Sequence, residues 1–370
     1  MKNFADLRTY AKWGRVALAL AAALASSLTV AAQGTVHVAA TVEYETIPTP
    51  TLPPNGQPGI GIDQMKALPG STLTYLSIKT VDGVKNKAAL WRPVNKAAAD
   101  TTMIISVHGG GNDFTQVPVR ALGIGLSPQG YAVLAINDRQ SGSENESRDN
   151  FYDISTDIDA ALQTAKAMGY RRIVIHGQSL GSTHVLFYAA THWDPVIQGV
   201  IVSAAMANLP WANHNKYGNA DVYQLRRKAA HEALKAGKRS ERMQIDKGPS
   251  SPVLENHDTN PGDMPFVPES SAQFFVTYED YLSAGADSTY WIHRIPHPVL
   301  VVRSESDGLE RSIEGTWLLS AARDEGSLVP DMTYAVVPDT HPPSAEGHAF
   351  VYNADQYVDI VQKWLAARHL

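Results

Sequence analysis

The chain has 370 residues, of which 44% are hydrophobic and 18% charged, and it contains no cysteine. Without cysteine, disulfide frameworks, thiolate metal sites and thiol nucleophiles are excluded, so any catalysis must use oxygen and nitrogen groups. The formal net charge of -6 gives no global electrostatic reason to bind nucleic acid, whose binding proteins usually carry a strongly basic face.

Residues 1–32 are predicted to be a secretory signal peptide. Basic residues occur up to Arg15, an apolar run follows, and small residues lead to a cleavage site that we place after Ala32. An uncleaved membrane anchor is the alternative, but the run from Val16 to Ala32 is shorter than the ~20 residues that a spanning helix needs. We therefore expect a periplasmic or secreted protein with no stable membrane span after cleavage.

Residues 33–70 are predicted to be an extended, Pro/Gly-rich lead-in, because their prolines are too closely spaced for a helix or a central strand. From Ser71 onward, apolar runs alternate with helical patterns. This alternation predicts an α/β domain over residues 71–370, with a mostly parallel sheet and helices on both faces.

The domain is expected to open with an antiparallel hairpin, Leu73–Val81 and Lys87–Arg92, around Asp82-Gly83. Short apolar, β-branched runs predict six further strands at Met103–Val107, Tyr131–Ile136, Arg172–His176, Gln198–Ser203, Pro298–Arg303 and Thr333–Val337. Helical spacing predicts helices at Ile154–Met168, Leu180–Ala190 and Gln356–Leu370.

The long segment between Ser203 and Pro298 shows no clear strand and far exceeds the usual connection length. We interpret about residues 205–295 as a cap inserted into the sheet domain. Its basic helix candidate, Ala220–Arg242, is interpreted as solvent-exposed, the alternative being a site for acidic substrates. The aromatic residues that follow either line a pocket or pack in a core.

The sharpest motif is Gly177-Gln178-Ser179-Leu180-Gly181, where a predicted strand ends and a helix begins. A nucleophile elbow needs this arrangement, with a serine on a strained turn and glycines two residues away on either side. The alternative is an ordinary glycine-rich turn. The motif predicts Ser179 as a catalytic nucleophile.

A second motif, His108-Gly109-Gly110-Gly111, follows the strand Met103–Val107. Acyl transfer builds negative charge on a carbonyl oxygen, and glycines let backbone N–H groups face that oxygen without interfering side chains. We predict the N–H groups of Gly109, Gly110 and Leu180 as the oxyanion hole, the alternative being a flexible strand-to-helix loop.

A serine nucleophile needs a base and an acid that orients the base, in the chain order serine, acid, histidine. Asp307 and His348 follow two later strands and would lie at the carboxyl edge of the sheet, where ligands bind. Glu305 is the competing acid and His341 the competing base. Asp339 follows a different strand from the expected acid.

In this order of motifs, the chain resembles the α/β-hydrolase family over about residues 71–370. The resemblance implies a Ser-His-Asp triad of Ser179, His348 and Asp307, and a cap entering after the sixth strand. It also implies that the loop Asn137–Ser143 borders the site. The position before the nucleophile, acidic in many hormone-sensitive-lipase-like members, is Gln178 here.

Other histidines are interpreted as structural or unliganded. Strand and helix geometry would point His176 and His184 away from Ser179, and Pro296 separates His293 from His297. We predict no metal and no cofactor.

The sequence thus predicts a secreted serine hydrolase, carboxylesterase- or lipase-like, acting on a small-molecule or lipid-like ester. An amidase, peptidase or thioesterase would use the same triad. A non-catalytic binding protein on the same fold is a third hypothesis. The sequence leaves the acyl and alcohol specificity and the oligomeric state open.

Overall fold

The computed structural model describes residues 42–52, 61–142, 148–212, 220–243 and 270–370. The predicted signal peptide, residues 1–32, lies outside these ranges. So do residues 33–41 and 53–60 of the predicted lead-in. No helix within them combines the length and the apolar composition needed to cross a membrane.

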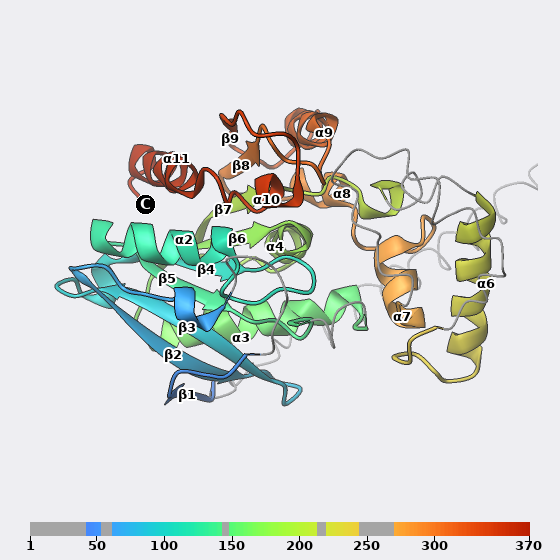
Figure 1. Cartoon of the computed structure of the whole chain (residues 1–370), viewed down its shortest axis with the longest axis horizontal. Coiled ribbons are helices and arrows are strands. Elements are labelled where there is room, and N and C mark those ends of the chain that lie inside the picture. The colour runs from blue at the N-terminus through green and yellow to red at the C-terminus, as the bar shows by residue number, and fades with distance from the viewer. Residues whose placement is uncertain (1–41, 53–60, 143–147, 213–219, 244–269) are drawn as a thin grey trace, which may run out of the picture. The chain divides into compact units, whose positions relative to one another are not determined.

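A nine-stranded sheet organises the domain, in the order β1-β2-β3-β5-β4-β6-β7-β8-β9 (Figure 1). The first four strands in this order pair antiparallel, and from β5 to β9 all neighbours are parallel. The strand bounds are Tyr44–Ile47 (β1), Ser71–Lys79 (β2), Lys85–Pro93 (β3), Thr102–Val107 (β4), Ala132–Ile136 (β5), Arg172–Gln178 (β6), Ile197–Ser203 (β7), Val299–Ser304 (β8) and Met332–Val337 (β9). The predicted hairpin and the six predicted parallel strands are confirmed.

One strand was not expected. β1 lies in the predicted lead-in, just before the proline run that begins at Pro48, and pairs with β2 from Tyr44 opposite Ile78 to Ile47 opposite Tyr75. Four residues carry little sequence signal, and this short edge strand forms because β2 offers it an unpaired edge.

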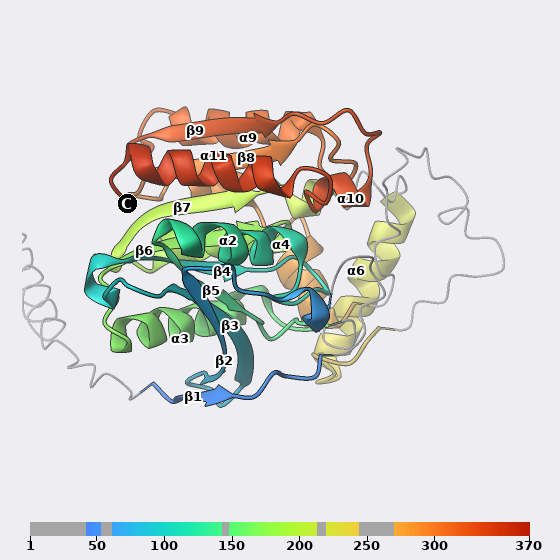
Figure 2. The same cartoon turned by 60° about the vertical axis from the view of Figure 1, so that its left-hand side comes forward.

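Helices cover both faces of the sheet, as predicted (Figure 2). α2 (Val117–Leu126) and α11 (Ala354–Ala367) pack with one buried cluster, and α3 (Ile154–Ala167), α4 (Leu180–Thr191) and α9 (Ser312–Arg323) with the other. α4 is buried from Leu180 to Ala190, because it lies at the centre of its face under neighbouring helices.

Residues between β7 and β8, called the insertion below, contain α6 (Ala220–Lys235), α7 (Ala272–Phe274), the π-helical turn η6 (Phe275–Glu279) and α8 (Ser288–Ile292). α6 ends sooner than predicted, at Lys235 before Gly237, where the backbone has φ 76°. Phe274, Phe275 and Tyr278 are buried, so these aromatic residues pack in a core.

The basic helix is not exposed along its whole length. Arg226 is buried and forms an ion pair of 2.8 Å with the buried Glu279. Beside it, Arg227 Nε lies 3.3 Å from Asp280 Oδ2. These arginines therefore attach α6 to the η6 segment, while the lysines of α6 remain at the surface.

Candidate active site

Ser179 occupies the sharp turn between β6 and α4. Its backbone has φ 52° and ψ -122°, a strained conformation for a residue with a side chain. Its neighbours Gln178 and Leu180 are buried, whereas Ser179 is partly exposed. The turn therefore presents this hydroxyl above the carboxyl end of the sheet.

The two glycines of the elbow permit close backbone contacts. A Cβ atom on Gly177 would lie 2.1 Å from the carbonyl oxygen of Gly181, and one on Gly181 would lie 2.4 Å from the carbonyl oxygen of His108. Both positions require glycine because the elbow, α4 and the end of β4 meet there without room for a side chain.

Asp307 and His348 are brought together by the structure. His348 Nδ1 lies 3.0 Å from Asp307 Oδ1 and 3.1 Å from Oδ2, and both side chains are buried. Burial alone would raise the pKa of Asp307, but attraction and hydrogen bonding to His348 and the N–H of Glu310 lower it below its usual value. Asp307 is thus an ionised acceptor for the Nδ1–H of His348.

A tight junction of two loops positions this pair. Asp307 follows β8, and His348 ends the short helix α10 (Ala345–His348). Ser344 caps α10 by accepting a hydrogen bond from the N–H of Gly347, and its own N–H donates to Ser306 O at 2.9 Å. A Cβ on Gly347 would collide with that same carbonyl, so glycine lets the two loops touch.

The competing acid and base occupy different places. Glu305 is exposed, and its Oε2 accepts the N–H of Asp339. His341 is half exposed, pairs with Asp339 Oδ1 at 2.6 Å and stacks on Tyr352 with ring centroids 3.9 Å apart. His341 and Asp339 therefore form a separate pair, in which the side chain of Asp339 is largely covered and also accepts the hydroxyl of Ser306.

The glycine loop, residues 108–111, lies beside the elbow. Neither the N–H of Gly110 nor that of Leu180 is donated to another described residue. Leu180 begins α4, so its N–H is one of the unpaired donors at a helix N-terminus, where anions are favoured.

Gly109 requires a correction to the predicted oxyanion hole. Its N–H donates a hydrogen bond of 2.9 Å to the buried Gln116 Oε1, so this donor is already engaged. A Cβ at Gly109 would lie 2.5 Å from Gln178 Oε1 and 3.0 Å from Ser179 Cβ. Gly109 thus serves as the point of close approach between the glycine loop and the elbow.

Ser179 lies next to the glycine loop, and Asp307 lies next to His348. Within the described ranges, no hydrogen bond joins Ser179 to His348. The glycine loop, Ser179, Asp307 and His348 all follow the carboxyl ends of parallel strands in one sheet. Catalytic hydrogen bonds commonly form only when a substrate is bound. The missing hydrogen bond is therefore compatible with Ser179 and His348 acting together in catalysis.

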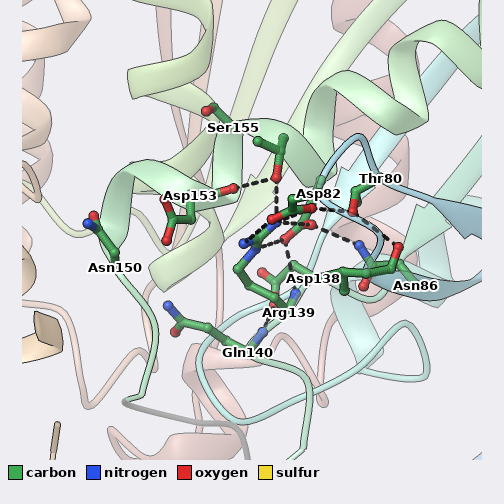
Figure 3. A network of polar contacts seen from close by, with 12 residues as sticks. Thr80, Asp82, Asn86, Asp138, Arg139, Gln140, Asn150, Asp153 and Ser155 are labelled. Atoms are coloured by element: carbon green, nitrogen blue, oxygen red, sulfur yellow. Dashed lines mark hydrogen bonds and ion pairs between the residues drawn. The ribbon is translucent and has the colours of Figure 1, made fainter. Parts of the chain in front are cut away.

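The loop after β5, residues 137–142, is held by a polar network that the sequence did not reveal (Figure 3). Arg139 donates from Nε to Asp157 Oδ2 on α3 at 2.9 Å and from Nη1 to Asp82 Oδ2 in the β2–β3 turn at 3.0 Å. Asn86 of β3 also donates to Asp157. The family resemblance implied that this loop borders the site, but no local sequence pattern predicted its contacts with these distant residues.

Among the described residues, no three histidine, aspartate or glutamate side chains gather as a metal site would require. His293 directs its Nδ1 at the carbonyl oxygen of Thr289, 3.3 Å away, and its Nε2 lies 2.7 Å from Arg294 Nη1.

Comparisons with known proteins agree with this fold. A sequence model of the alpha/beta hydrolase fold matches residues 102–346. A search of curated proteins finds no match.

Three solved structures share the fold at low sequence identity. The α/β hydrolase GrgF from Penicillium sp. sh18 has 14% identity and a TM-score of 0.56, covering 80% of this chain and 99% of that one. DcsB in complex with its substrate analogue has 15% identity and a TM-score of 0.54, with coverage of 80% and 99%. Est1E from Butyrivibrio proteoclasticus with bound ferulic acid has 15% identity and a TM-score of 0.53, with coverage of 77% and 96%.

Proposed function

Since this chain belongs to the alpha/beta hydrolase fold family, we propose that it is a serine hydrolase that cleaves carboxylic esters. The observation that carries the proposal is the strained, partly exposed Ser179 at the strand-to-helix elbow. A non-glycine residue in such a conformation costs of order 1–3 kcal/mol, a cost usually found where function requires it.

In the proposed reaction, Ser179 Oγ attacks the ester carbonyl and His348 Nε2 takes its proton. The ionised Asp307 keeps the other ring proton on Nδ1, which leaves the Nε2 lone pair free for that role. The N–H groups of Gly110 and Leu180 stabilise the oxyanion. His348 then protonates the leaving alcohol, and water, activated by the same histidine, releases the acid from the acyl-enzyme.

The proposal is tested by labelling with a fluorophosphonate probe and by hydrolysis of p-nitrophenyl esters of graded chain length. Ser179→Ala should abolish labelling and reduce turnover by at least roughly 10³-fold. Ser312→Ala, which changes an exposed serine at the start of α9, is the matched control and should retain both. Full turnover in Ser179→Ala would refute the mechanism.

An ester is proposed over an amide or thioester as the substrate class, and parallel assays of matched ester, amide and thioester substrates decide between them. Turnover of the amide exceeding that of the ester would make the protein an amidase. The absence of labelling together with the absence of turnover of all three would favour a binding protein.

We also propose that the protein is exported, on the basis of the basic, then apolar pattern of residues 1–32. Expression of the full chain in a bacterial host, followed by intact mass measurement, should give a mature protein that begins at Gln33. Recovery of the uncleaved chain from the membrane fraction would contradict this proposal.

A further inference from the structure

The loop after β5 connects the glycine loop to the insertion. Arg139 fixes this loop to α3 and the β2–β3 turn (Figure 3). Its neighbours in the loop contact other parts of the site: Asp138, Gln140 and Ser141 reach His108, His184 and Tyr278. These contacts form a chain of polar groups between two segments far apart in sequence.

At one end of the chain, His108 holds the glycine loop. Its Nδ1 lies 2.7 Å from the carbonyl oxygen of Gly109, which can only accept, so Nδ1 carries the proton. Its Nε2 then accepts hydrogen bonds from the Ser141 hydroxyl at 2.7 Å and from the N–H of Asp138 at 3.3 Å. The hydrogen-bond pattern therefore assigns one tautomer to a neutral His108.

This tautomer matters for the proposed oxyanion hole. The carbonyl of Gly109 and the N–H of Gly110 belong to the same planar peptide unit. When His108 Nδ1–H holds the carbonyl, it also fixes the opposite direction of the Gly110 N–H. His108 thus orients a donor without touching substrate.

At the other end, Tyr278 of η6 joins the insertion to α4. Its hydroxyl accepts a hydrogen bond from Gln140 Nε2 at 2.5 Å and lies 2.9 Å from His184 Nε2. Because Gln140 already donates to the hydroxyl, the tyrosine proton is free to be donated to His184 Nε2. The remaining proton of a neutral His184 then lies on Nδ1, which is 3.7 Å from Asp138 Oδ2, too far for a hydrogen bond, so His184 ends this branch of the chain.

Asp138 completes the connection, since its N–H donates to His108 Nε2 and its Oδ1 accepts the N–H of Gln140 at 2.8 Å. The side chains of Tyr278, Gln140, Asp138 and His108 are all buried, so water does not compete for these contacts. Burial raises the pKa of Asp138, and burial lowers the pKa of His184 to about 3. In such a dry environment, the loss of one partner disturbs the orientation of the others.

We propose that Tyr278 is a positioning residue: through Gln140, Asp138 and His108, its hydroxyl couples the seating of the insertion to the orientation of the Gly110 N–H. This inference rests on the proposed serine hydrolase function. Under this proposal, the oxyanion hole is fully formed only when η6 is docked on α4.

The test is Tyr278→Phe, which removes one hydroxyl and keeps the ring. This ring stacks on that of Phe274, with the two ring centroids 4.1 Å apart. Misorientation of one oxyanion donor should lower kcat for p-nitrophenyl acetate roughly tenfold with KM within about twofold. The affinity for a trifluoromethyl ketone, whose adduct with the serine places an oxyanion in the same hole, should fall by a similar factor.

The matched control is Tyr223→Phe. Tyr223 is also a tyrosine of the insertion, and its hydroxyl donates to Asp280 Oδ1 at 2.7 Å, away from the chain of contacts just described. This variant should retain kcat and inhibitor affinity. Thermal unfolding of both variants shows whether a loss of stability accompanies either result.

A double-mutant cycle adds a readout that packing alone would not move. If Tyr278 acts through Gln140, the effects of Tyr278→Phe and Gln140→Leu on inhibitor affinity should be strongly sub-additive. Additive effects, or a Tyr278→Phe enzyme that loses thermal stability but keeps kcat and inhibitor affinity, would overturn the inference. If the proposed serine hydrolase function itself is wrong, a different experiment shows it, because the Ser179→Ala variant would then retain full ester hydrolysis.

Discussion

Gln178 lies so close to Gly109 that a Cβ atom on the glycine would meet Gln178 Oε1 at 2.5 Å. Gln178 is fully buried, and neither polar atom of its amide has a hydrogen-bond partner among the described residues. The amide that precedes the nucleophile therefore packs against the glycine loop without a hydrogen bond to any described residue.

Gly109→Ala is expected to reduce kcat by roughly 100-fold, because the new methyl group forces the glycine loop away from Ser179 and displaces the oxyanion donors. The same substitution combined with Gln178→Ala removes the colliding amide and should recover part of the loss. Steady-state kinetics on the two variants and on Gln178→Ala measure the effect. Equal activities for the single and double variants would show that this contact is not the cause.

Asp307→Asn should lower kcat by about 10³- to 10⁴-fold, because an amide no longer fixes the proton of His348 on Nδ1. Asp339→Asn serves as control, since Asp339 pairs with the half-exposed His341 and the amide oxygen of asparagine can still accept the Ser306 hydroxyl, and should change kcat less than about fivefold. Kinetics on both variants make the comparison. The reverse ranking would assign the acid to Asp339 and the base to His341.

Acid should destabilise the fold through His176. This buried histidine contacts the hydroxyls of Ser106, Ser203 and Tyr357, and burial lowers its pKa from 6.5 to about 3. The unfolded chain binds the proton first, so stability is full above pH 6.5 and is lost as pH falls toward 3, by up to roughly 4 kcal/mol.

The measurement is urea unfolding of the wild type and His176→Gln between pH 7 and pH 4. The difference between the two proteins isolates His176, because burial raises the pKa of Asp149 to about 6 and that group acts in the opposite direction in both. The stability difference should shrink as pH falls. His369→Gln, at an exposed position, should leave the pH dependence of the wild type unchanged, and a constant difference for His176→Gln would contradict the assignment.

Arg226→Met should destabilise the insertion by about 3–5 kcal/mol, because it leaves Glu279 buried without its counter-charge. Adding Glu279→Leu removes the stranded carboxylate and should restore most of that loss. Arg227→Met is the comparison, since Arg227 is partly exposed. Thermal unfolding checks the three variants, and an equal effect of the two single arginine changes would argue against burial as the reason.

The sequence was sufficient to predict the sheet, because parallel strands are buried on both faces and appear as short β-branched runs. It did not reveal α2, which contains Pro118 and two glycines and so has weak helical propensity. Packing explains that composition: a Cβ on Gly123 would lie 2.4 Å from the ring of Trp91. Tertiary contact, invisible in the local pattern, outweighs propensity here.

The site shows the same division. Motif order was sufficient to nominate Asp307 and His348, which the structure places in contact. It was insufficient for Gly109, whose N–H is taken by a side chain seven residues later. It was also insufficient for Tyr278 and His184, which meet across 94 positions. Contacts between side chains of distant segments depend on the folded backbone, and no spacing rule encodes them.

The insertion leaves the sheet at the end of β7, beside the loops that carry Asp307 and His348, and the chain returns to β8, the strand paired with β7. Its two ends are thus fixed by sheet hydrogen bonds that do not depend on its contents. We therefore expect that the insertion can be replaced by a corresponding segment of another hydrolase without loss of the sheet. A transplanted segment would need a hydroxyl in the place of Tyr278 to preserve turnover as well as selectivity, so grafts chosen by shape alone should bind new substrates yet convert them slowly.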